Sequence, residues 1–245
     1  MTVNAARELE DGRVCLVGVG PPNAAANLAR RLHAPNCVLV YESGAIGAKP
    51  ARLPLSIGDD DLAASADELV SVVEMFNYWI GGGRIDVGFL AAAQIDRFGN
   101  INTTAIGSYE HPSVRLPGAG GAPEISAAAG EVIVLVKHSR RTFVEQLDFM
   151  TSVGAGTPAM SRSDLGFPGR GPTVVITDLG VLRPNPDDGE FELTALHPDV
   201  ELAEVIAETG WDLRVRDPLE TTAPPTEEEL QTLRALRGTR EDANE

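Results

Sequence analysis

The sequence predicts an α/β fold in which a mostly parallel sheet is covered by helices on both faces. Short apolar runs rich in Val, Ile and Leu alternate along the chain with stretches of helical periodicity. Within these runs the apolar residues are nearly continuous, which is typical of strands that are buried on both faces. Repeated strand–helix units form parallel sheets, and 245 residues with 43% hydrophobic content suit a single domain over residues 1–245.

The apolar runs place the strands, and helical start and stop signals place the first helices between them. Pro21 and Pro22 head a helix over Asn23–Leu32, because proline is favoured where a helix begins. An apolar stripe over Leu62–Ile80 predicts a long helix that Gly81 ends. The expected strands are Val14–Val19, Cys37–Glu42, Val87–Ala91, Val132–Val136 and Thr173–Thr177.

Two further helices are expected towards the end of the chain. Pro198 and Asp199 open one that continues to Thr209 and is closed by Gly210. Thr226 and the glutamate three residues later form a capping box for the last helix, which reaches about residue 237.

The charge and the composition exclude several classes of function. The formal net charge is −16, from 36 acidic and 20 basic residues, so the chain would repel a phosphate backbone and no nucleic-acid partner is expected. The histidines lie far apart without metal-ligand spacing, so no metal is expected. They are His33, His111, His138 and His197.

The chain shows no sign of a membrane or secretory segment. Its first residues lack the apolar core of a signal peptide, and no apolar run approaches the ~18 residues of a membrane span. Cys15 and Cys37 both lie within apolar runs, where they are expected to be small core residues rather than a disulfide or a metal site. A cytoplasmic protein is therefore expected.

Three loops could carry chemistry at the carboxyl ends of the strands, where ligands gather in open α/β sheets. The first loop has Glu42 at the end of an apolar strand, followed by Gly44 and Gly47, which allow a sharp turn. Glu42 is expected at the rim of the sheet, either as a functional carboxylate or as a glutamate that is solvated or paired with an arginine.

The second and third loops are rich in polar residues and in glycine. Gln94–Thr104 carries many amide, hydroxyl and carboxylate side chains around an expected turn at Asp96–Asn100. Pro117–Ala122 has three glycines whose N–H groups suit a pyrophosphate or the oxyanion of a thioester under attack. The same cluster could be only a flexible connector. Neither GxGxxG nor GxxxxGK is present there, and no GxSxG elbow occurs in the chain.

Taken in order, these segments resemble the B subunit of family I CoA-transferases, most closely the glutaconate CoA-transferase type. The resemblance covers nearly the whole chain. Its motifs are GVGPP after the first strand, ESG at 42–44, AQIDRFGNINTTAIG at 93–107, HPSVRLPGAGGA at 111–122, KHSRRTF at 137–143, LGFPGRGP at 165–172, TDLGVL at 177–182 and ETGWDL at 208–213.

The resemblance implies a three-layer α/β/α fold of the NagB/RpiA/CoA-transferase type and a partner A subunit, in a heterodimer or an α2β2 heterotetramer. It implies an active site at the subunit interface with Glu42 as the catalytic nucleophile. Coenzyme A would be a substrate, and no metal would be needed. The substrate-binding residues that it implies are Gln94, Gly118, Gly120, Gly121 and Ala122.

The implied reaction is a ping-pong transfer of CoA through a glutamyl-CoA thioester, from an acyl-CoA donor to a carboxylic acid acceptor such as a dicarboxylate or a 3-oxoacid. One alternative is a CoA-thioester hydrolase or lyase on the same scaffold, of the ring-opening or decarboxylase type. Another is a noncatalytic subunit that binds CoA esters. Residues 45–47 depart from the glutaconate pattern, which leaves the acyl donor and the acceptor open.

Overall fold

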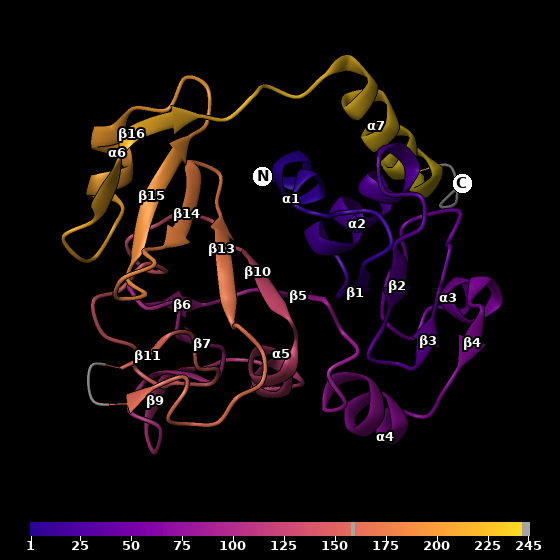
Figure 1. Cartoon of the computed structure of the whole chain (residues 1–245), viewed down its shortest axis with the longest axis horizontal. Coiled ribbons are helices and arrows are strands. Elements are labelled where there is room, and N and C mark those ends of the chain that lie inside the picture. The colour runs from indigo at the N-terminus through magenta and orange to yellow at the C-terminus, as the bar shows by residue number, and fades with distance from the viewer. Residues whose placement is uncertain (158–159, 242–245) are drawn as a thin grey trace. The chain divides into compact units, whose positions relative to one another are not determined.

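The computed structural model describes residues 1–157 and 160–241 (Figure 1). The chain divides into two compact units, of which the first comprises residues 1–89 together with the chain from residue 224 onward, and the second comprises residues 90–223. The single domain over residues 1–245 stays a prediction, because two compact units can belong to one domain.

The strands of the first unit follow the parallel arrangement that the apolar runs predict. Strand β1 (Val14–Leu16) pairs in parallel with β2 (Val38–Val40) and with β5 (Val87–Leu90). Two short antiparallel strands extend this sheet beyond β2, namely β3 (Ala45–Ile46) and β4 (Glu68–Leu69). The long apolar runs thus give parallel strands, and the short strands continue the sheet antiparallel.

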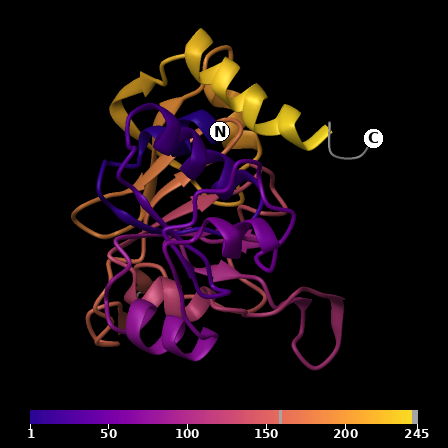
Figure 2. The same ribbon diagram turned by 90° about the vertical axis from the view of Figure 1, so that its right-hand side faces the viewer.

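The helices at the two ends of the chain belong to the same unit. Helix α2 (Pro21–Leu32) begins at the predicted prolines and packs against α1 (Thr2–Arg7) and α7 (Glu227–Glu241), which is drawn in yellow in Figure 2. The predicted capping box is confirmed, because Thr226 and Glu229 exchange hydrogen bonds between their backbone N–H groups and side chains.

The predicted long helix over Leu62–Ile80 is wrong. The segment forms α3 (Asp60–Ser65), β4, α4 (Val72–Glu74) and the π-helix η1 (Met75–Ile80). Ala66 leaves the helical conformation with φ −71° and ψ 145°, because the backbone that follows it pairs with β3. Ser71 and Glu74 then form a capping box that starts the next helix.

The second unit has a sheet of mixed direction. Strand β10 (Glu131–Leu135) pairs in parallel with β13 (Pro172–Ile176). Beyond β13 the strands follow in the order β14 (Gly180–Pro184), β15 (Phe191–Leu196) and β16 (Arg214–Thr221). Strand β14 is antiparallel to both β13 and β15, whereas β15 and β16 are parallel. The strands predicted at Val132–Val136 and Thr173–Thr177 are confirmed with small shifts.

Shorter elements complete the second unit. Helix α6 (Leu202–Ala207) begins later than predicted, because Asp199 has a left-handed φ of 65°. The other helix is α5 (Ala122–Ala128), and the two-stranded pairs are β6 (Gln94–Ile95) with β7 (Ile101–Asn102), β8 (Ala105–Gly107) with β9 (Pro112–Arg115), and β11 (Gly156–Thr157) with β12 (Met160–Ser161).

His138 is a buried polar residue just after β10. Its ring stacks on Phe143 with a centroid distance of 3.8 Å and hydrogen-bonds with the hydroxyls of Thr177 and Thr209. Burial lowers the pKa of His138 from 6.5 to about 4. The imidazole is therefore neutral in the folded protein at neutral pH, and it packs in the core as an uncharged ring.

We predict that His138 makes the protein less stable in mild acid. Between pH 6.5 and about 4 the unfolded chain binds a proton that the folded chain does not, so stability falls as the pH falls, by up to about 1.4 kcal/mol per pH unit. His138→Gln, which keeps a polar side chain, should show a shallower loss in urea unfolding measured from pH 7.5 to pH 5. The exposed His111→Gln should retain the wild-type slope, and equal slopes for all three proteins would contradict the prediction.

Candidate active site around Glu42

Glu42 lies in the turn between β2 and β3. The N–H of Tyr41 donates to the carbonyl of Ala45, and the N–H of Gly44 donates to the carbonyl of Tyr41, each at 2.9 Å. Glu42 and Ser43 therefore occupy the centre of a four-residue turn, and both are half-buried. The predicted strand Cys37–Glu42 is shorter than expected, since β2 ends at Val40, and Glu42 stands on the turn instead of the strand.

Gly44 fixes the course of this turn. Its φ is +102°, in a region that side chains disfavour, and its carbonyl accepts a 3.0 Å hydrogen bond from the N–H of Val70. A Cβ at Gly44 would overlap the carbonyl of Val70. Glycine is therefore required at this position both by the backbone conformation and by the close approach of the neighbouring chain.

A pocket of about 280 Å³ adjoins the turn within the first unit. Ser43 and Ala45 line one part of it, and α3 and the segment before it line another. The side chain of Asp59 is engaged, because it accepts hydrogen bonds from the N–H groups of Leu55 and Asp61. The remaining lining is mostly apolar, which suits a small apolar part of a ligand. It comprises Ile57, Gly58, Asp60, Leu62, Ala63, Leu69 and Val70.

Gln94 belongs to a hydrogen-bonded network in the second unit. Its Oε1 accepts from Asn102 Nδ2 at 2.7 Å and from the N–H of Asp148 at 3.1 Å, and its Nε2 donates to Asp148 Oδ2 at 2.7 Å. The residue is 6% exposed. The amide of Gln94 therefore joins β6, β7 and the segment at Asp148, and its contact with a substrate stays a prediction.

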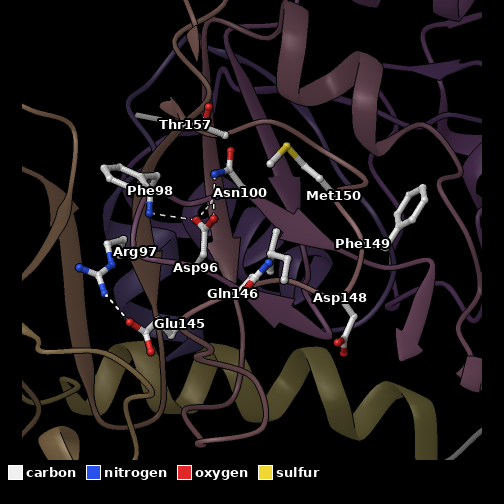
Figure 3. Close-up of a pocket in the computed structure, with 11 residues that line it drawn as sticks. Asp96, Arg97, Phe98, Asn100, Glu145, Gln146, Asp148, Phe149, Met150 and Thr157 are labelled. Atoms are coloured by element: carbon white, nitrogen blue, oxygen red, sulfur yellow. Dashed lines mark hydrogen bonds and ion pairs between the residues drawn. The ribbon is translucent and has the colours of Figure 1, made fainter. Parts of the chain in front are cut away.

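The polar turn predicted at Asp96–Asn100 is present. The carboxylate of Asp96 accepts hydrogen bonds from the N–H groups of Phe98 and Asn100 and from the Asn100 amide (Figure 3). Gly99 has a φ of +70°, as expected for such a turn. Burial raises the pKa of Asp96, against the lowering effect of these hydrogen bonds. The turn is stabilised internally.

The second and third loops are joined to each other. The N–H of Gly118 donates to the carbonyl of Thr103 at 2.9 Å, and the Thr103 hydroxyl donates to the carbonyl of Gly118 at 2.8 Å. The N–H of Ala122 donates to the carbonyl of Ala119. In the part of the chain that the structure describes, the N–H groups of Ala119, Gly120 and Gly121 have no such backbone partner. These three groups are the backbone donors that the loop could offer to a ligand.

The second unit has a pocket of about 480 Å³ with an acidic lining (Figure 3). Asp96, Glu145 and Asp148 outnumber its one cation, Arg97, whose guanidinium lies 3.6 Å from Glu145 and 3.8 Å from Glu190. The glycine loop does not line it. An acidic lining with a paired cation repels carboxylates and phosphates, so this pocket does not suit an anionic ligand.

The predicted site residues fall in both units. Glu42 belongs to the first unit, whereas Gln94 and Gly118–Ala122 belong to the second. Gln94 bonds to Asn102 and Gly118 bonds to Thr103, and these two partners are consecutive residues. Sequence reasoning did not single out the buried side chains behind the Glu42 turn. Polar residues within the alanine-rich run of α2 were the only signal that could have found them.

The described residues contain no group of three or more His, Cys, Asp or Glu side chains that could hold a metal ion. Among the helices over the described ranges, none combines the length and apolar character needed to cross a membrane.

Comparison with known proteins gives consistent matches. The family model for coenzyme A transferase matches residues 1–208. The B subunit of the 3-oxoadipate CoA-transferase of Pseudomonas knackmussii is 58% identical over 236 residues, which cover 96% of this chain and 91% of that protein. The structure of glutaconate coenzyme A-transferase from Acidaminococcus fermentans matches with a TM-score of 0.87 and 32% identity, over 95% of this chain and 91% of that chain. The decarboxylase AibA/AibB matches with a TM-score of 0.83 and 26% identity, over 98% and 95% of the two chains.

We predict that Gly44→Ala loosens the turn that carries Glu42. The left-handed backbone costs a side chain roughly 1–2 kcal/mol, and the overlap with Val70 adds to this, so the free energy of unfolding should fall by at least about 2 kcal/mol. Urea unfolding measures the loss, and hydrogen exchange at the Val70 N–H should accelerate.

Gly18→Ala is the matched control, because a Cβ at Gly18 meets no atom within 4 Å. It should leave stability within about 0.5 kcal/mol of the wild type. Wild-type stability and an equally protected Val70 amide in Gly44→Ala would disprove the constraint.

Proposed function

Because this chain belongs to the coenzyme A transferase family, we propose that it moves CoA from an acyl-CoA donor to a carboxylic acid acceptor, with Glu42 as the nucleophile. The single observation that carries the role of Glu42 is its position on a fixed, half-buried turn in the segment that carries the family's ESG motif. Half-burial leaves Glu42 accessible to a ligand, and the turn fixes the position of its backbone.

The chain is a transferase subunit of the B type and works with an A subunit, as the two-subunit relatives do. Coenzyme A is its substrate. A heterodimer and an α2β2 assembly both fit a pairing of the two subunit types. A cytoplasmic location stays a prediction, and it is supported by two cysteines, Cys15 and Cys37, that are free thiols, as a reducing compartment favours.

The proposed cycle has two halves that mirror each other. The Glu42 carboxylate attacks the thioester carbon of the donor, the C–S bond breaks, and an acyl–glutamyl anhydride and CoA thiolate form. The thiolate then attacks the glutamyl carbonyl, which releases the donor acid and leaves a glutamyl-CoA thioester. The acceptor carboxylate runs these steps in reverse and leaves as the new acyl-CoA. One thioester replaces another, so the balance needs no oxidant or reductant.

A glutamate carboxylate is ionised at neutral pH but is a weak nucleophile, so position must supply much of the acceleration. Well-oriented reactants gain roughly 7–11 kcal/mol relative to free ones. The N–H groups of Gly120 and Gly121, which lack a backbone partner within the described residues, suit the oxyanion of the attacked thioester, and such a donor contributes about 3 kcal/mol. The A subunit would exclude water, which otherwise hydrolyses both the anhydride and the thioester.

The acceptor that we propose is a 3-oxo dicarboxylic acid. The relative with 58% identity is named a 3-oxoadipate CoA-transferase, and a 3-oxo dicarboxylate satisfies both acceptor classes that the sequence left open. A hydrolase or lyase on the same scaffold is the alternative, and it is supported by the lower identity of 26% to a decarboxylase. In that reaction Glu42 would act as a general base toward water and would carry no CoA.

We predict that borohydride traps CoA transfer at Glu42. The two-subunit enzyme incubated with acyl-CoA alone should hold a glutamyl thioester, which borohydride reduces to an alcohol, and mass spectrometry should find this change on the peptide that carries Glu42. Glu42→Asp withdraws the carboxylate by one methylene and should lower kcat by at least about 100-fold, since a displacement of 1 Å costs that much.

Glu68→Asp is the matched control, because Glu68 is an exposed glutamate of the same unit on β4. It should keep wild-type transfer. Turnover of acyl-CoA without any adduct at Glu42 would favour the hydrolase or lyase, and normal transfer by Glu42→Asp would remove Glu42 as the nucleophile.

A further inference from the structure

A buried chain of polar side chains lies directly behind the turn that carries Glu42. The hydroxyl of Tyr41 donates a 2.7 Å hydrogen bond to Asn23 Oδ1, and Asn27 Nδ2 donates to the same oxygen at 2.8 Å. Arg30 continues the chain with a 3.2 Å hydrogen bond to Asn27 Oδ1. Tyr41 and Asn27 are fully buried, and Asn23 is 1% exposed.

The three residues that continue this set of hydrogen bonds from Tyr41 share one face of α2. Asn23, Asn27 and Arg30 stand at positions i, i+4 and i+7, which fall on a single stripe of a helix. The other buried residues of α2 are small or apolar, and include Ala24, Ala25, Ala26, Leu28 and Ala29. Core packing alone would be served by more residues of that kind, since burying polar groups is costly unless every one of them is hydrogen-bonded.

Two polar atoms among these buried side chains lack a hydrogen-bond partner. Within the described residues, Asn23 Nδ2 and Arg30 Nε are buried and have no hydrogen-bond partner. Proteins seldom retain such groups without a reason, and local rules are most often broken next to functional sites. At the other end of these hydrogen bonds stands Tyr41, whose hydroxyl donates to Asn23 Oδ1.

Tyr41 is both the first residue of the turn and the end of the buried chain. Its N–H and C=O close the turn through Ala45 and Gly44, while its ring points into the core and its hydroxyl reaches α2. Burial raises the pKa of Tyr41 to about 12, so the hydroxyl stays protonated and remains a hydrogen-bond donor at any working pH. Glu42 is the next residue along the chain, so a shift of Tyr41 displaces it directly.

We propose that Tyr41, held by Asn23, is the positioning residue that aims Glu42 at the thioester. The hydrogen bond from the Tyr41 hydroxyl fixes the start of the turn to α2, and the backbone of the turn transmits this position to Glu42. The role rests on the proposed function of Glu42. Neither Tyr41 nor Asn23 touches the substrate in this arrangement, so their effect falls on the chemical step and spares substrate binding.

The test compares matched variants of the complete two-subunit enzyme. Tyr41→Phe removes one hydroxyl and keeps the ring, so it should slow formation of the glutamyl adduct and lower kcat by on the order of 100-fold, the loss that accompanies a 1 Å misplacement. KM for acyl-CoA should stay unchanged, and a larger share of acyl-CoA should be lost to water. Tyr78→Phe is the control, because Tyr78 is an exposed tyrosine, 63% accessible, in the same unit, and it should behave as the wild type.

Variants of Asn23 separate positioning from folding. Asn23→Asp keeps an acceptor oxygen for Tyr41 and should retain most of the rate, whereas Asn23→Leu removes the acceptor and should match Tyr41→Phe. The double variant of Tyr41→Phe and Asn23→Leu should be no slower than either single variant, since both remove the same interaction. The Asn23 pair decides the question even if Tyr41→Phe fails to fold.

The outcomes distinguish this inference from the function on which it rests. Adduct formation at the wild-type rate in Tyr41→Phe or Asn23→Leu, or equal losses in Asn23→Asp and Asn23→Leu, would overturn the positioning role and leave Glu42 as the nucleophile. A wild-type enzyme that forms no adduct would overturn the proposed function, and the role of Tyr41 with it.

Discussion

The close approach of Gly44 to the carbonyl of Val70 is the constraint on which the arrangement around Glu42 depends. The edge strand β4 can pair with β3 only because no side chain stands at Gly44. The same glycine closes the turn with its N–H on Tyr41. The turn that carries the proposed nucleophile is held by these backbone hydrogen bonds, which are costly to break in a buried setting.

The loops of the second unit are held by side-chain hydrogen bonds as well as by backbone ones. Within its second loop the Asn102 amide donates to Gln94, and the Thr103 hydroxyl of the same loop donates to the carbonyl of Gly118 in the glycine loop. Within the described residues, the N–H groups of Gly118 and Ala122 bond to backbone carbonyls, whereas those of Ala119, Gly120 and Gly121 have no backbone partner. A glycine-rich segment can thus be partly rigid and still present backbone donors.

The features that depend on residues close together in the sequence were mostly predicted correctly. The buried strands, the proline start of α2, the capping box before α7 and the turn at Asp96–Asn100 follow from composition and spacing. The match of the family model confirms the resemblance and the α/β class. The helix expected over Leu62–Ile80 failed, because pairing of β4 with β3 is a contact between distant segments that no helical periodicity records. For the same reason the partner of Tyr41 could not be read from the sequence, since Asn23 lies eighteen residues away on another element.

Helix α7 lies late in the sequence but belongs to the same compact unit as the first residues of the chain. Glu229 caps the start of α7 and also forms a 2.7 Å ion pair with Arg7, near the beginning of the chain. The first unit is therefore completed by residues from 224 onward, whereas the second unit is one continuous segment, 90–223. During translation the segment 90–223 therefore leaves the ribosome as one continuous piece, whereas the unit that carries Glu42 can be completed only after α7 has been synthesised.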